Sequence, residues 1–262
     1  MDPQRKAAAA IEQLGGHVVY DFEKFDGANI PETRPLEAEI DRLFGASAPE
    51  DRPKVVFAEL RGPLFSDENL RLLHDLPHLE GLTISFSNVT DSGLAHLVGM
   101  KELTRLDLFK TAVKGSGLEY VASLPNLEDL ALEVSPTENA GLAHLASAAS
   151  LWRLIVGGTG VTDAEVPYLA RIPRLTSLSI EGTFITGAGL RHLRSCKHLT
   201  DLQLGDRQLT REGIEHLKSM TGLRKLFADA PDLAPEYESE LRRALPQLRI
   251  GGGWYQTGFS QR

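Results

Sequence analysis

The stretch LTISFSNVTDSGLAHL, residues 82–97, decides the fold, because its leucines recur along the chain at one fixed spacing. Together with the residues just before it, this stretch carries the pattern L-x-x-L-x-L, formed by Leu79, Leu82 and Ile84. The pattern returns every 24 residues, with its first members at Leu103, Leu127, Leu151, Leu175, Leu199 and Leu223. A fixed period of roughly 20–50 residues indicates stacked structural repeats, so the chain is predicted to be an array.

The second half of each unit predicts a short helix on the opposite side of the coil. Leu94 and Leu97 are three residues apart, and the same spacing recurs in the other units, which gives each helix one apolar face. A threonine directly before this segment is expected to cap the helix, as at Thr90, Thr162, Thr186 and Thr210. Glycine in the first helical turn costs helix propensity, so we expect close packing against the neighbouring coil at Gly93, Gly117, Gly141, Gly189 and Gly213.

Eight such units run from 55 to 247, and the T-x-V-T-D-x-G-L-x-x-L form of the unit resembles that of leucine-rich repeat proteins. The likeness is to bacterial, planctomycete-type repeats and to the repeats carried by F-box proteins, although no F-box is evident in this chain. The resemblance implies an α/β solenoid with a curved parallel sheet inside and short helices outside. It also implies a surface that binds other proteins.

One position departs from the family pattern. Where the family usually has asparagine, this chain has hydroxyl side chains at Ser87, Thr111, Ser135, Thr159 and Thr183. A hydroxyl forms fewer hydrogen bonds between coils because it lacks the two donors of an amide. Arg207 interrupts the series, so the later coils are expected to be looser there.

The segments at both ends are expected to cap the array, because a solenoid otherwise exposes its core. Residues 1–54 are predicted to form a helical N-terminal cap, with helices over 2–14 and 35–45 and a strand beginning at His17. The alternative for this segment is a small interaction module of its own.

Residues 248–262 are predicted to supply a last strand and an aromatic tail, preceded by a helix over 234–245. Trp254, Tyr255 and Phe259 lie among glycines in this tail. Two interpretations remain open, since the tail either folds back on the last coil or forms an exposed peptide that contacts a partner.

The amino-acid composition limits which partners and which cellular compartment are expected. The 262 residues are 42% hydrophobic and carry a formal net charge of −8, with no run of lysine and arginine, so nucleic-acid binding is not expected. Cys196 is the single cysteine, which fits a reducing compartment. No apolar run approaches the roughly 20 residues that span a bilayer, and the N-terminus does not have the form of a signal peptide. We therefore expect a cytoplasmic, monomeric protein with no membrane partner.

The residues between the leucines of each strand are the candidates for partner binding. Strand side chains alternate, so the leucines point inward and the intervening residues face the concave side. The middle of this face combines arginine, apolar and acidic side chains, types that are frequent at binding hot spots: Arg105, Asp107, Phe109, Asp129, Glu133, Arg153 and Ile155. The alternative is a solvated face with cross-strand pairs such as Arg105–Asp129 and Asp129–Arg153.

No catalytic, metal-binding or cofactor-binding residue is predicted. Histidines share one repeat position, but a 24-residue period spreads them along the solenoid axis instead of converging them on a metal ion: His96, His144, His192 and His216. GGTG at 157–160 lacks the lysine of a phosphate-binding loop and fits a repeat turn. Cys196 occupies an apolar repeat position and is expected to be a buried hydrophobe.

The sequence thus predicts a non-catalytic scaffold or adaptor that binds a protein partner on the concave sheet face. One alternative is an inhibitor or immunity-type protein that caps another enzyme. A more remote alternative is an enzyme whose site lies in the caps.

Overall fold

The computed structural model describes residues 2–21, 53–136, 141–228 and 233–251. The predicted cap helix over 35–45 and the aromatic tail with Trp254, Tyr255 and Phe259 lie outside the described residues. The strands are β1 (His17–Tyr20), β2 (Val55–Arg61), β3 (Gly81–Ser85), β4 (Arg105–Phe109), β5 (Asp129–Ala131), β6 (Arg153–Ile155), β7 (Ser177–Ser179), β8 (Asp201–Gln203), β9 (Lys225–Phe227) and β10 (Arg249–Gly251). The helices are α1 (Pro3–Gln13), η3 (Asp67–Asp75), η4 (Gly93–Leu97), α3 (Leu118–Ala122), η5 (Gly141–Ser147), α4 (Val166–Leu169), η6 (Gly187–Ser195), α5 (Arg211–Lys218) and α6 (Pro235–Ala244), where η marks a 3₁₀ helix.

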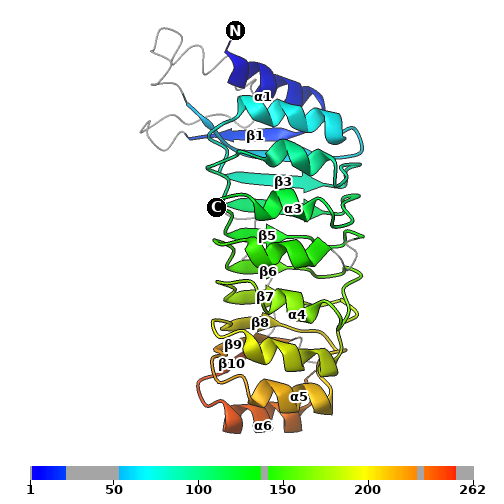
Figure 1. The fold of residues 1–262 in the computed structure, drawn as a ribbon, viewed down its shortest axis with the longest axis vertical. Coiled ribbons are helices and arrows are strands. Elements are labelled where there is room, and N and C mark those ends of the chain that lie inside the picture. The colour runs from blue at the N-terminus through cyan, green and yellow to red at the C-terminus, as the bar shows by residue number, and fades with distance from the viewer. Residues whose placement is uncertain (1, 22–52, 137–140, 229–232, 252–262) are drawn as a thin grey trace.

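All the strands join one sheet in the order of the sequence. β1 runs antiparallel to β2, and every later strand is parallel to its neighbour, so the coils stack along the long axis of the molecule (Figure 1). The register pairs residues 24 positions apart, such as Leu82 with Leu106 and Leu106 with Leu130. The predicted α/β leucine-rich repeat solenoid is confirmed.

The core lies between the sheet and the row of helices on one side of it. Val55 and the repeating leucines of the strands point into this layer and are buried, as are Leu94 and Leu97 from the helix side. Burying one leucine side chain contributes about 1.5–3 kcal/mol. The same small contribution in every coil therefore holds the array together, in place of one central core.

The helices are short because each coil has only a few residues to return across the back of the sheet. Four of the seven between β2 and β9 are 3₁₀ helices, which rise faster per residue than an α-helix. Glycine permits their close stacking, since a Cβ at Gly117 would lie 2.6 Å from the carbonyl oxygen of Asp91 in the preceding coil. The predicted close packing at these glycines is confirmed.

The two ends are covered by elements that the sequence predicts. Ile11 of α1 and Val18 of β1 are buried against the first coil, and β1 adds an antiparallel strand to β2. At the other end, Leu241 of α6 is buried and β10 pairs with β9.

The prediction that threonine side chains cap the helices is mostly wrong. Only Thr210 accepts a hydrogen bond from a helix backbone N–H, that of Gly213 at 3.2 Å. The Thr186 hydroxyl instead donates to Asp163 of the preceding coil at 2.7 Å. Asp163 also accepts from the Thr186 backbone N–H, at 2.7 Å. Asp163 therefore bonds two consecutive coils together.

The prediction that the coils are held together more loosely at Arg207 is also wrong. The next residue, Gln208, is buried and supplies the missing amide. Its Nε2 donates to the Ile185 carbonyl of the preceding coil at 2.5 Å, and its Oε1 accepts from the Gly205 N–H at 2.9 Å. The interruption thus moves the bonding side chain by one position and keeps the contact between coils.

Candidate partner-binding surface

The open sheet face consists of the strand side chains that point away from the core. The register of β4, β5 and β6 places Arg105, Asp129 and Arg153 in one row across adjacent strands. Asp107 lies in the next row, opposite Ala131 and then Ile155. Phe109 ends β4, and Glu133 follows β5. The seven candidate residues are therefore brought together on three neighbouring coils.

These residues are not equally available to a partner. Arg105 is exposed, while Asp107, Phe109 and Glu133 are half-buried. The side chains of Asp129 and Ile155 are buried, since the two residues are only 6% and 7% exposed. Arg105, Asp107, Phe109 and Glu133 therefore form the accessible part of the predicted surface.

One predicted cross-strand pair is present. Arg153 Nη1 lies 3.1 Å from Asp129 Oδ2, and both side chains are largely buried. Burial raises the pKa of Asp129, and the charges of Arg153 and Arg105 act against that rise. Among the described residues, Arg105 forms no ion pair with Asp129, so its guanidinium stays exposed at the surface.

Asp107 is the most perturbed carboxyl on this face. Its Oδ1 is buried and has no hydrogen-bond partner in the described part of the chain. Burial, followed by the negative charges of Glu133 and Asp129, raises its pKa to about 7, although the Phe109 backbone N–H acts in the opposite direction. Burial and the charge of Glu181 likewise raise the pKa of Glu133. Negative charge here exceeds the positive charge that faces it.

The sheet face changes character beyond β6. Ser177, Ser179 and Gln203 are buried, and the Ser179 hydroxyl donates to Gln203 Oε1 at 3.1 Å. Gln203 in turn donates through Nε2 to Glu181. The strand residues of β7 that face this side are thus neutral, and the carboxyl groups with raised pKa values are those of Asp107, Asp129 and Glu133, near the middle of the array.

An aromatic and cationic cluster adjoins the face, and the sequence reasoning missed it. Phe86 follows β3, and its ring meets Phe109 edge-on with centroids 5.2 Å apart. Arg61 and Lys110 lie 5.1 and 5.0 Å from the centroid of the Phe86 ring. A signal was present in the sequence, because the equivalent positions of later coils hold Gly158 and Gly182.

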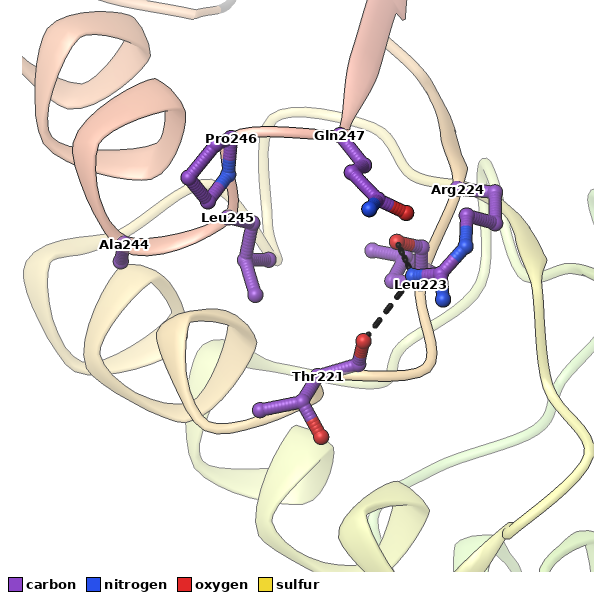
Figure 2. Close-up of a pocket in the computed structure, with 7 residues that line it drawn as sticks. All are labelled: Thr221, Leu223, Arg224, Ala244, Leu245, Pro246 and Gln247. Carbon is purple, nitrogen blue, oxygen red and sulfur yellow. Dashed lines mark hydrogen bonds between the residues drawn. The ribbon is translucent and has the colours of Figure 1, made fainter.

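The close-up in Figure 2 shows a hollow of about 330 Å³ between the end of α6 and the turn before β9. Arg224 lines it, but its Nη1 donates to the backbone carbonyls of Thr221 and Leu223 at 3.0 and 3.1 Å. The remaining lining residues are mostly apolar, and Gln247 is the other long polar side chain among them. The described residues that line this hollow include no acid–base pair.

The residues considered for catalysis or metal binding fit structural roles. Burial raises the pKa of the Cys196 thiol to about 11, the opposite of the shift that activates a nucleophile. Within the described ranges, no three histidine, cysteine, aspartate or glutamate side chains gather as metal ligands. None of the described helices is long and apolar enough to cross a membrane.

Comparison with known proteins returned structural likeness alone. No protein-family model matches the chain, and no match was found among curated proteins. Among solved structures, internalin C2 of Listeria monocytogenes is 19% identical, with a TM-score of 0.49 over 74% of this chain and 92% of its own. An internalin F from the same organism is 20% identical, with a TM-score of 0.46 over 73% and 71% of the two chains.

A leucine-rich repeat protein of Leptospira interrogans is 16% identical, with a TM-score of 0.46 over 69% of this chain and 50% of its own. At these identities the three likenesses concern the repeat fold alone, and they identify neither a partner nor a cellular location for this chain.

Proposed function

We propose that this chain is a non-catalytic protein-interaction scaffold whose open sheet face binds a partner segment carrying a basic side chain. The observation that carries the proposal is the shortage of positive charge around Asp107. A lysine or arginine of the partner, placed over the half-buried Asp107 side chain, would supply the missing positive charge. The coarser role as an interaction scaffold also fits the stacked-coil architecture.

The fold suits this role because it holds the face rigid before the partner arrives. Parallel strands at about 4.8 Å spacing fix the positions of the side chains in each row. A preordered surface loses little conformational freedom on binding, so more of the interaction energy appears as affinity. The exposed guanidinium of Arg105 and the ring of Phe109 would contact the partner beside the acidic centre.

The pH dependence of binding tests the acidic centre. The carboxylates whose charges act on Asp107 are those of Glu133, Asp129 and Glu59. The adjacent row of the face also holds Arg105 and Arg153. Since the pKa of Asp107 is about 7, its carboxylate is mostly protonated at pH 6 and mostly ionised at pH 8. Affinity for a basic segment should therefore rise about tenfold between these two values.

The experiment uses a partner captured from the lysate of the source cell with the intact chain as bait, then purified and titrated by calorimetry. Asp107→Asn should remove the rise in affinity with pH and weaken binding at pH 8. Asp201→Asn is the matched control, because Lys225 Nζ already lies 3.2 Å from that carboxylate. Equal affinities at both pH values, unchanged in Asp107→Asn, would rule out the acidic centre as the binding site.

A second variant tests the rest of the face without disturbing buried groups. Arg105→Ala combined with Phe109→Ala changes only exposed or half-buried side chains. Replacing Arg153 or Ile155 would be a poorer test, because one is in a buried ion pair and the other is itself buried. The double variant should bind the partner at least about tenfold more weakly than the parent.

A further inference from the structure

One residue in the turn that follows each strand from β3 to β7 has a left-handed backbone. Phe86, Lys110 and Val134 have φ values of 52°, 51° and 54°, and Gly158 and Gly182 continue the column at 67° and 69°. The backbone N–H of each of the first three donates to the next coil, to the carbonyls of Phe109, Glu133 and Gly157, at 3.0 Å in each case. The coil geometry therefore requires this conformation, whatever the side chain.

Glycine adopts this conformation without steric strain, while a bulky residue does not. Gly158 and Gly182 show that the fold itself needs no side chain in the column. Three successive coils thus have a residue other than glycine at this position, although the left-handed backbone is sterically unfavourable for Phe86, Lys110 and Val134. Strained positions of this kind gather at functional sites, so the surface that they form is a candidate for function.

These side chains form an exposed apolar cluster between two cations. Phe86 is 43% exposed and Val134 is 47% exposed. The Arg61 guanidinium and the Lys110 ammonium lie about 5 Å from the Phe86 ring centroid, and Lys110 Nζ also lies 5.2 Å from that of Phe109. We call this surface the strand-exit rim: Arg61, Phe86, Phe109, Lys110 and Val134.

The charge of the rim indicates what would cover it. The chain as a whole has a net charge of −8, but in its described part neither Arg61 nor Lys110 forms an ion pair with a carboxylate. Carboxylates of a partner would meet these two cations, and an apolar side chain between them would cover Phe86. The three coils that carry Arg61, Phe86 and Lys110 span about 10 Å, which is the length of three or four residues of extended chain.

We infer that the strand-exit rim binds a short extended segment of a partner protein in which carboxylates flank an apolar side chain. The inference goes beyond the proposed function, because four of the five rim residues lie outside the candidate set on the sheet face and Phe109 alone is shared. The preferred charge is also opposite. An acidic segment fits the rim, whereas a basic segment fits the centre around Asp107.

Defined peptides test this inference on the intact chain. The probe is a capped hexapeptide of alternating glutamate and leucine, titrated into isotope-labelled protein while backbone amide shifts are followed by NMR. Its controls replace every glutamate by lysine or every leucine by serine. Saturable shifts centred on the Phe86 and Lys110 amides, seen with the first peptide and absent with both controls, are expected.

Variants locate the binding site. Phe86→Gly should weaken binding of the glutamate–leucine peptide about tenfold, while its Tm stays within about 3 °C of the parent, because relief of backbone strain offsets the lost ring contacts. Lys110→Gln should also weaken binding. Phe184→Gly is the matched control: it removes another exposed phenylalanine, which lies beneath Arg207 several coils away, and should leave binding unchanged.

The inference is overturned if the lysine peptide binds the rim as well as the glutamate peptide does, or if Phe86→Gly binds the glutamate peptide with parental affinity. Shifts confined to residues outside the rim would also overturn it. Since this peptide has no cation, its failure would leave the pH-dependent proposal for the sheet face standing. Conversely, a pH-independent partner affinity would leave the rim untouched.

Discussion

The turns after β3, β4 and β5 and those after β6 and β7 share one backbone conformation, but their side chains differ. Phe86, Lys110 and Val134 stand in the first group, and Gly158 and Gly182 stand in the second. The repeat therefore dictates the path of the chain at this point and leaves the side chain free to vary. What differs between the two regions is surface chemistry, which is where functional difference among repeats is expected.

The buried side of the coils should show no such difference, and this gives the largest expected effect. Leu106 in β4 and Leu178 in β7 occupy the same repeat position and are both fully buried. Replacing either by alanine should lower the free energy of unfolding by about 2–5 kcal/mol. Urea unfolding of the two variants measures this, and a loss below about 1 kcal/mol at one site alone would break the equivalence of the two regions.

The second prediction concerns how the charge of a carboxylate on the sheet face affects stability in each of the two regions. The pKa of folded Asp107 is raised to about 7 from an ordinary value of 3.8, so the folded state binds the proton more tightly than the unfolded state. Stability should therefore fall as pH rises between these two values. Asp107→Asn should be more stable than the parent by roughly 2 kcal/mol at pH 8, after allowance for screening by solvent, and close to it at pH 4.

Asp201→Asn supplies the contrast, because Asp201 has a lysine beside it in the next strand. That variant should be no more stable than the parent at pH 8. If both asparagine variants gave the same change at pH 8, the charge imbalance around Asp107 would not distinguish the two regions. Thermal unfolding at pH 4, 6 and 8 is sufficient for the comparison.

The smallest expected effect concerns the left-handed column itself. At Phe86, glycine should give a protein more stable than alanine does by about 1 kcal/mol, since the required φ is sterically unfavourable for alanine and not for glycine. At Gly182, replacement by alanine should lower stability by a similar amount. Denaturant midpoints of the variants give the values, and a Phe86→Ala protein more stable than Phe86→Gly would show that the column is not strained.

The periodic part of the fold could be predicted from the sequence because one rule is repeated in every coil. Leu82 and its equivalents 24 residues apart can be buried together only if the coils stack in register, and the pairing of Leu82 with Leu106 shows this. The glycines of the helix segment were predicted for the same reason. Each is required wherever the next coil approaches closely, as at Gly117.

Contacts that depend on one coil's particular side chains could not be predicted in the same way. Gln208 replaces the interrupted hydroxyl series from a position one residue later, which an alignment of repeats hides. Asp163 bonds Thr186 of the following coil, a contact that the expectation of a threonine helix cap left out. The burial of Ile155 was not foreseen either, because strand alternation gives the direction of a side chain but not how deeply its neighbours cover it.

The most direct test of the central claim is to map the side chains that a bound partner protects. Hydroxyl-radical footprinting compares the free chain with its partner complex at Phe109 on the sheet face and at Tyr120 on the helix side, both of them partly buried in the free chain. The account predicts that Phe109 becomes less reactive when the partner binds and that Tyr120 does not change. Protection of Tyr120 with Phe109 unchanged would contradict it and move the binding surface to the helices.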